Sequence, residues 1–120
     1  MIIEQTKIDG VLLIKPTIYE DERGYFFESY RDDNFKNIGL SGKFSQDNET
    51  KSKKGTLRGL HYQLNYAQGK LVRVSLGEVY DVAVDIRLNS PTFGQYYGTV
   101  LSDNNHFQMY VPPGFAHGYI

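Results

Sequence analysis

The chain has 120 residues, of which 40% are hydrophobic, and its formal net charge is −1. A chain of this length builds at most one small domain, and the nearly neutral charge excludes the broad basic field that attracts nucleic acid. No cysteine is present, which excludes a disulfide framework and a thiolate metal site. No run approaches the roughly 18 apolar residues of a membrane span, and the first residues do not form a signal peptide. We therefore expect a cytoplasmic location and no membrane partner.

Alternation of apolar and polar residues with a period of two dominates the chain and predicts β-strands. Turn residues separate the expected strands, which are 11–14, 25–30, 70–76, 80–88, 95–101 and 107–111, and a further strand begins at Ala116. The only expected helix runs from Asp32 to Ile38, with Asp32 or Asp33 as its N-cap and Gly39 as its stop. Short strands at close intervals indicate an all-β fold, an antiparallel sandwich or barrel.

The stretch from Tyr80 to Leu88 shows the strictest alternation and is expected to be a central strand. Its apolar set is Tyr80, Val82, Val84, Ile86 and Leu88, and its other face carries Asp81, Ala83, Asp85 and Arg87. We expect the apolar face to pack against other parts of the protein. The face with three charges is either solvated or, inside a barrel, lines a polar cavity.

The segment 56–63, TLRGLHYQ, contains Arg58 and His61, and Lys70 follows it by seven residues, so His61 stands between two cations in the sequence. Metal sites on strands usually need two or more ligands on one face, and no second histidine follows at i+2 or i+4. A lone histidine beside arginine and lysine suits proton transfer on an anionic substrate better than metal binding. A purely structural histidine explains the same residues equally well, and no metal is expected in either case.

Three further segments carry residue types suited to binding. Residues 21–28, DERGYFFE, form a turn that leads into an aromatic strand, with Arg23 and Glu28 at either side. Residues 46–48, QDN, precede the histidine segment, and residues 111–118, VPPGFAHG, place His117 after a proline–glycine turn. The chain also holds ten Tyr and seven Phe, and tyrosine often lines sugar pockets, although aromatic residues are equally typical of strands.

Taken in this order, these four segments resemble the dTDP-4-dehydrorhamnose 3,5-epimerase family. The resemblance runs from about Ile8 to the last residue and includes the strand 79–87, VYDVAVDIR, and the turn 90–94, SPTFG. It implies one cupin-like jelly-roll domain over residues 1–120, a homodimer, and no cofactor. The implied substrate is a dTDP-linked 4-keto-6-deoxyhexose that is epimerised at C3 and C5. Members of the family continue past the position of Ile120, so a missing C-terminal part is expected.

The implied chemistry follows from the acidity that a 4-ketone gives to the protons on both neighbouring carbons. Removing one proton gives an enolate, and returning a proton to the opposite face inverts the centre. Such a site needs a base, an acid and a cation near the enolate oxygen. The resemblance implies His61 as the base and Lys70 as the cation. It places the acid, a tyrosine, and the carboxylate partner of the catalytic histidine beyond Ile120.

The resemblance also implies residues that bind the substrate. Arg58 matches a ligand of the diphosphate, because a guanidinium pairs well with phosphate oxygens. The other matching positions are Arg23, Phe26, Glu28, Gln46, Asn48 and His117. The residues alone leave a cross-strand ion pair between Arg23 and Glu28 equally open, and Lys51–Gly55 is expected to be a solvated basic turn. Asp81 and Asp85 are expected at most to orient His61 or Lys70.

Three other functions compete with two-centre epimerisation. An epimerase acting at one centre, or on a related nucleotide-linked 4-ketosugar, needs the same base and cation. A non-catalytic cupin-type domain that binds a sugar nucleotide is a second alternative. A metal-dependent cupin is disfavoured, because it needs a His-x-His pair and a downstream glutamate on paired strands.

Overall fold

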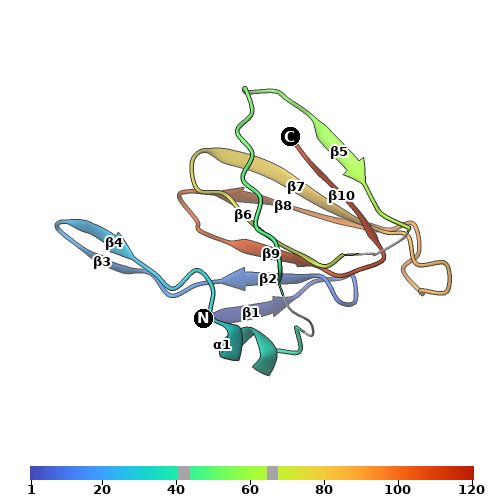
Figure 1. The fold of residues 1–120 in the computed structure, drawn as a ribbon, viewed down its shortest axis with the longest axis horizontal. Coiled ribbons are helices and arrows are strands. Elements are labelled where there is room, and N and C mark those ends of the chain that lie inside the picture. Colours follow the sequence, from blue (N-terminus) through green and yellow to red (C-terminus); the bar gives the residue numbers. More distant parts are fainter. Residues whose placement is uncertain (41–43, 65–67) are drawn as a thin grey trace.

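The computed structural model describes residues 1–40, 44–64 and 68–120. Within this part of the chain, two four-stranded sheets face each other and a two-stranded hairpin projects to one side (Figure 1). All strand pairs are antiparallel. The first sheet has the order β1 (Ile2–Gln5), β2 (Leu12–Lys15), β9 (Gln108–Val111) and β6 (Lys70–Arg73). The second has the order β5 (Arg58–His61), β10 (Phe115–Tyr119), β7 (Glu78–Asp85) and β8 (Tyr96–Ser102).

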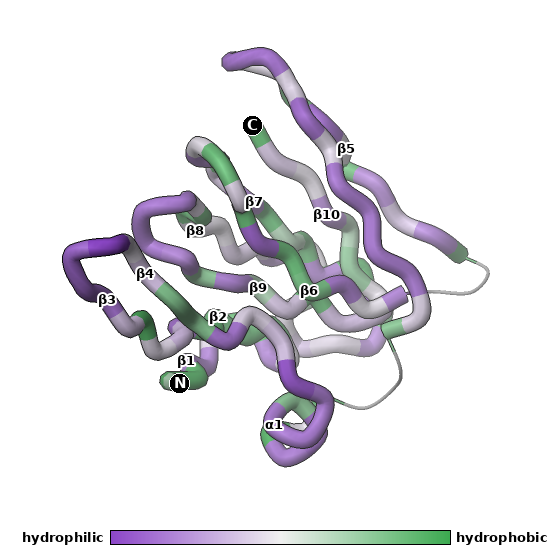
Figure 2. The backbone as a smooth tube through the Cα atoms, turned by 60° about the vertical axis from the view of Figure 1, so that its left-hand side comes forward, coloured by the Kyte–Doolittle hydropathy of each residue, from purple (hydrophilic) through white to green (hydrophobic). Residues whose placement is uncertain are grey.

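The projecting hairpin and the helix complete the described elements. The hairpin consists of β3 (Tyr19–Asp21) and β4 (Gly24–Phe26), and its hydrophilic turn points away from the sheets (purple in Figure 2). The helix α1 (Asp32–Asn37) lies beside the first sheet. Among the described residues, no helix is long and apolar enough to cross a membrane.

Two apolar clusters lie on opposite faces of the first sheet. The cluster between the sheets contains Ile8, Val11, Leu13, Met109 and Val111, together with Ala83, Leu101 and Phe115 from the second sheet. The outer cluster contains Leu12, Ile14 and Tyr110, covered by Phe35 of α1 and by Leu40. Successive residues of β2 and β9 alternate between the two clusters, as the period of a strand requires. The helix is therefore held by the outer face of the first sheet.

The predicted fold class is confirmed: the described chain is an antiparallel all-β sandwich with one short helix. The strands predicted at 11–14, 95–101 and 107–111 lie within one residue of their observed bounds. The strands predicted at 25–30 and 70–76 are shorter, ending at Phe26 and Arg73. The predicted N-cap is wrong, because Arg31 holds that position and makes no side-chain cap bond, while Asp32 forms an ion pair with Lys36 at 2.8 Å.

The face of β7 that points into the sandwich is the one that carries the charges. Asp81, Ala83 and Asp85 are fully buried, whereas Tyr80 is 43% exposed and Leu88, beyond the end of the strand, is 83% exposed. The prediction that the apolar set packs is wrong for Tyr80 and Leu88, and the alternative that the charged face lies inside is the one that the structure shows. Each buried carboxylate has acquired its own hydrogen-bond partner, which offsets much of the free energy needed to remove it from water.

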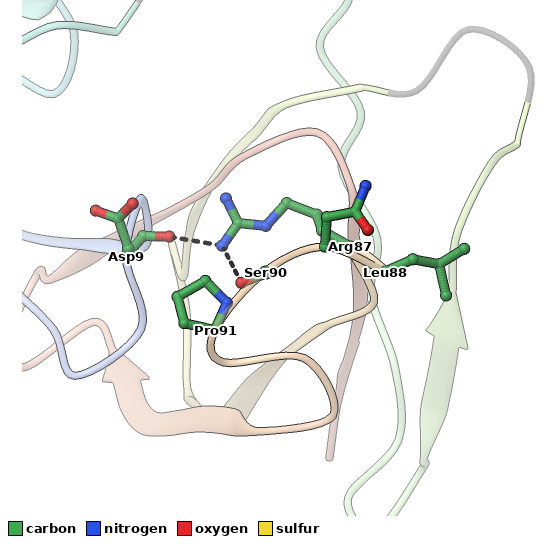
Figure 3. Close-up of a pocket in the computed structure, with 6 residues that line it drawn as sticks. Asp9, Arg87, Leu88, Ser90 and Pro91 are labelled. Carbon is green, nitrogen blue, oxygen red and sulfur yellow. Dashed lines mark hydrogen bonds between the residues drawn. The ribbon is translucent and has the colours of Figure 1, made fainter.

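Asp85 is the anchor of the connection between β7 and β8. Its carboxylate accepts hydrogen bonds from the Arg87 guanidinium at 3.0 Å and from the hydroxyls of Ser90 and Thr92. Arg87 also donates to the backbone oxygen of Asp9 and to Ser90 (Figure 3). The Arg87 hydrogen bond is the main reason that the pKa of Asp85 lies well below its ordinary value, although burial opposes it. This cluster closes the turn by internal bonds, so its role is structural.

Replacing Asp85 with Asn should lower the free energy of unfolding of the whole protein by about 2 kcal/mol at neutral pH, because hydrogen bonds to a charged group are worth about 1.5–3 kcal/mol. The pKa of Asp85 is depressed in the folded state, so its contribution is present above the unfolded pKa and is lost as the pH falls through the folded one. Urea denaturation at neutral pH and in acid should therefore show a smaller difference between wild type and variant in acid.

The matched control is Asp9→Asn, which removes the same charge from an exposed side chain whose contact with Arg87 runs through the backbone. Equal stability losses in the two variants would contradict the anchoring role of Asp85.

Candidate active site

The strands β5 and β10 bring two histidines together in the second sheet. In their antiparallel register, His61 lies directly opposite His117, and Ala83 of β7 is the next residue in the same row. Directly opposed residues of antiparallel strands project to the same face. Because Ala83 is fully buried between the sheets, this row lies on the inner face. His117 is buried, whereas His61, on the edge strand, is exposed.

Two glycines permit the close approach of these strands. Gly59 has a φ of +95°, and a Cβ at this position would lie 2.5 Å from the backbone oxygen of His117. A Cβ on Gly118 would lie 2.7 Å from the backbone oxygen of Arg58. Real Cβ atoms essentially never approach so closely, so a larger residue at either position would push β5 away from β10. The glycines beside the two histidines are therefore what sets His61 opposite His117.

His117 is held by a buried carboxylate. Its Nε2 lies 2.8 Å from Oδ1 of Asp81, whose side chain is fully buried on the inner face of β7. The pKa of Asp81 is raised above its ordinary value, because burial outweighs the opposing effects of the hydrogen bond with His117 and of the charges of His117 and Lys70. The expectation that Asp81 and Asp85 orient His61 or Lys70 is corrected here, because their hydrogen bonds go to His117 and to Arg87.

Lys70 faces this group from the other sheet. It begins β6, an edge strand, and its register partner on β9 is Val111, which is buried in the core between the sheets. The register therefore places Lys70 on the inner face as well. Its charge is the smallest of the causes that act to lower the pKa of Asp81. The candidate base and the candidate cation thus lie on facing sheets.

Arg58 lies one row away from the two histidines, opposite Tyr119 of β10. Its Nε donates a hydrogen bond to the hydroxyl of Ser52 at 2.8 Å, so the basic turn Lys51–Gly55 helps to hold the arginine. The turn itself is exposed, as expected. A guanidinium carries five N–H donors and this contact uses one, so Arg58 is suited to bind an anion at the edge of the sheet.

Gln46 and Asn48 lie on the segment that leads to β5. Residues 44–57 run without helix or strand from the region of α1 to β5 (green in Figure 1). Both amide side chains are exposed, and Gln46 Nε2 donates to Asn48 Oδ1 at 3.2 Å. Gln46 and Asn48 are thus in contact with each other, and their segment leads into the strand that carries Arg58 and His61.

The predicted residues on and beside the hairpin make their own contacts, which in the described part of the chain do not include His61 or His117. Phe26 is 72% exposed on the projecting hairpin (Figures 1 and 2). Arg23 forms an ion pair with Asp21 at 2.6 Å, and Glu28 accepts a hydrogen bond from Asn34 at 3.0 Å. The alternative of an ion pair between Arg23 and Glu28 is therefore wrong.

Sequence reasoning missed the part played by the glycines and by Asp81. A signal was present, because a glycine lies two residues before His61 and another directly follows His117. Glycine inside a strand marks a bulge or a close backbone approach, and the register of β5 and β10 does shift between His117 and Tyr119.

A sandwich of two antiparallel sheets with histidines, a lysine and a buried aspartate on its facing inner surfaces defines a jelly-roll protein with a polar interior site. The family model described as dTDP-4-dehydrorhamnose 3,5-epimerase matches residues 5–120. The chain belongs to this family, and the resemblance inferred from the four segments is confirmed.

Individual relatives agree with this placement. The dTDP-4-dehydrorhamnose 3,5-epimerase of Salmonella typhimurium is 55% identical over 122 residues, which cover 100% of this chain and 67% of that protein. The crystal structure of the dTDP-6-deoxy-D-glucose-3,5-epimerase from Legionella pneumophila, in complex with dTDP-4-keto-L-rhamnose, has a TM-score of 0.95 and 54% identity, covering 98% of this chain and 63% of that one. A 3'-monoepimerase from Streptomyces bikiniensis, in complex with dTDP-quinovose, has a TM-score of 0.89 and 30% identity, covering 96% and 59%.

These likenesses confirm the predicted cupin-like jelly roll. The chain spans about two thirds or less of the length of these relatives.

Replacing Gly59 with Ala should separate β5 from β10 and thereby disturb the histidine pair. A non-glycine residue in the left-handed region costs about 1–2 kcal/mol, and at Gly59 the clash with His117 adds to this cost. Gly55→Ala is the matched control, since Gly55 has a similar φ of +86° but open space around its Cβ position. Chemical denaturation of the whole protein should show a larger loss for Gly59→Ala than for Gly55→Ala. Equal losses would mean that the close approach is not a constraint.

Proposed function

We propose that the whole protein inverts C3 and C5 of dTDP-4-dehydro-6-deoxyglucose to give dTDP-4-dehydrorhamnose, a step of dTDP-L-rhamnose biosynthesis. The observation that carries this proposal is the placement of His61 opposite His117 on one inner face, with Lys70 on the facing sheet. Membership of the epimerase family supports it. A biosynthetic role of this kind fits a cytoplasmic protein.

His61 is the proposed base. Its imidazole takes the proton from C5 or C3, and the electron pair of the broken C–H bond moves into an enolate with its negative charge on the C4 oxygen. Imidazole suits this task because it both accepts and returns protons near neutral pH. The exposed position of His61 on the edge strand leaves it accessible to a sugar.

Lys70 is the proposed partner of the enolate oxygen. An ammonium group stabilises charge that appears only after deprotonation, so its contribution goes mainly to the transition state. A proton then returns to the opposite face of the same carbon from an acid, which the family resemblance places outside these 120 residues. No cofactor takes part in the proposed steps.

The remaining predicted residues are proposed to bind the substrate. Arg58 binds the diphosphate, and Gln46 and Asn48, on the segment that leads to β5, bind the nucleotide or the sugar. His117 lines the pocket beside the sugar or the diphosphate. An anionic substrate at this edge would be held by these few cations and not by a broad positive field, because the formal net charge of the chain is only −1.

Inversion at a single centre is the second candidate. The structural likeness to a 3'-monoepimerase favours it, because the same base and cation serve one centre as well as two. The walls of the pocket and the position of the acid decide between the two reactions.

Solvent exchange tests the proposal directly. The whole protein is incubated in D₂O with dTDP-4-keto-6-deoxyglucose, and NMR locates the deuterium in the recovered sugar. Two-centre epimerisation predicts deuterium at both C3 and C5, whereas a single labelled carbon would indicate the second candidate. An absence of exchange, with the sugar nucleotide bound, would leave only a binding function and would contradict the proposal.

Variants of three residues should separate chemistry from binding. His61→Ala should reduce turnover by about two to four orders of magnitude, the usual contribution of general-base catalysis, with nucleotide binding nearly intact. Lys70→Ala should also act mainly on turnover. Arg58→Ala should weaken binding first, because it removes charge pairing that is present in both ground and transition states. Steady-state kinetics and dTDP titration measure the two effects.

The matched control is Arg73→Ala, which removes an exposed cation from the other end of β6 and should change neither quantity. Wild-type deuterium exchange at C3 and C5 in His61→Ala would return His61 to a structural or binding role.

We further propose a homodimer in which the projecting hairpin packs on a second copy. Tyr19, Tyr25 and Phe26 of the hairpin are each more than half exposed, at 65%, 55% and 72%. Such an aromatic surface gains free energy when it is covered. In this arrangement Arg23 and Glu28 reach the pocket of the neighbouring subunit, which would explain why their contacts in the described part of the chain do not include its own histidines.

Light scattering of the whole protein at micromolar concentration should give the mass of a dimer. Phe26→Asp should shift the population towards monomer, because it buries a charge in the proposed contact. Leu76→Asp, at a residue 82% exposed in a turn outside the hairpin, is the matched control and should leave the mass unchanged. A wild-type monomer would contradict the dimer.

A further inference from the structure

Asp81 is a buried charged residue to which the proposed reaction gives no role. Its side chain is fully buried, and its Oδ1 contacts Nε2 of His117 at 2.8 Å. Its second oxygen, Oδ2, is also buried and has no hydrogen-bond partner among the described residues. An unsatisfied buried oxygen costs folding free energy. Stability alone therefore does not explain why this carboxylate is inside the sandwich.

The groups around Asp81 belong to the candidate site. Its register partners are Tyr119 on β10 and Thr99 on β8, and the row that holds His117 and His61 is the next one on the same face. From the facing sheet, the charge of Lys70 acts on Asp81. Asp81 thus shares an inner face with the histidine pair, and Lys70 lies on the facing sheet.

A purely structural role for the contact is the competing explanation. The contact joins β10 to β7, but these strands are already joined by five register pairs, from Phe115–Asp85 to Tyr119–Asp81. Breaking one side-chain contact inside such a ladder would leave the strands paired. A carboxylate held against one ring nitrogen can instead orient an imidazole and select its tautomer.

We propose that Asp81 is a positioning residue of the site, which fixes His117 in the Nε2–H tautomer and holds a negative charge opposite Lys70. This inference rests on the proposed function. An ionised carboxylate has no proton to donate, so Nε2 of His117 carries the proton of the contact. Nδ1 is then an acceptor, suited to a hydrogen bond from a sugar hydroxyl. The histidine opposite His61 is thereby held in one orientation and one hydrogen-bonding pattern.

The tautomer is directly measurable by long-range ¹H–¹⁵N NMR of the imidazole rings in the whole wild-type protein at neutral pH. The signals of His117 are identified by their loss in His117→Gln. A protonated Nε2 and an unprotonated Nδ1 are expected. A protonated Nδ1 would overturn the proposal.

Asp81→Asn then tests the consequence for the reaction. Asparagine has nearly the same size and keeps a contact with His117, but its amide can donate to Nε2 and so favours the opposite tautomer. The expected result is a switch of the His117 tautomer and a fall in kcat of about tenfold to a hundredfold, as for other partners of functional histidines, with KM little changed. If Asp81 only ties the strands together, kcat stays at the wild-type value, and the proposal fails.

Thr99→Val is the matched control. It changes the register partner of Asp81 on β8 without touching the His117 contact, and it should retain wild-type kcat.

If Asp81→Asn does not fold, the tautomer of His117 in the wild-type protein still decides whether the proposal holds. Failure of the proposed function is recognised separately, since it requires a wild-type protein that exchanges no deuterium. An active wild type with unchanged turnover in Asp81→Asn contradicts the role of Asp81 alone.

Discussion

The two buried carboxylates of β7 are the constraint on which the rest of the structure depends. A strand that turns Asp81 and Asp85 inwards is stable only if each charge finds partners inside the protein. Asp85 finds them in the turn that follows β7, where Arg87, Ser90 and Thr92 surround it. Asp81 finds His117 on the neighbouring strand. Asp85 thus stabilises the turn at the end of β7, and Asp81 contributes to the polar surface between the sheets.

The space between the two sheets has an apolar part and a polar part, because the residues that fill its core differ from those that the edge strands contribute. Leu13, Met109 and Phe115 fill the apolar core, while His61 and Lys70 come from the edge strands β5 and β6. The close approach at Gly59 and Gly118 brings the edge strand β5 onto β10, so its histidine lies level with His117. A core that stabilises the sandwich and an accessible edge with the candidate catalytic residues therefore coexist in one small structure.

Local pattern predicted much of the fold, and the family resemblance supplied the candidate site residues, whose roles stay predictions. Strands such as β8 and β9 follow directly from alternation and turn residues, and both lie within one residue of the predicted bounds. The sequence left two placements open for the charged face of β7, because alternation shows that a strand has two faces without showing which one is buried. That choice depends on partners distant in sequence: His117 is 36 residues away from Asp81. The glycine contact depends in the same way on two strands that meet only in the folded chain.

The most direct test of the account is a crystal structure of the whole protein with its dTDP-linked ketosugar. The account predicts that the sugar lies between the inner faces of β6 and β10, with its C4 oxygen within hydrogen-bond distance of Lys70. His61 should lie beside the ring at C3 and C5, and the diphosphate should contact Arg58. A sugar bound outside the sandwich, for example in the hollow beside Arg87, would contradict the central claim that the facing inner surfaces form the active site.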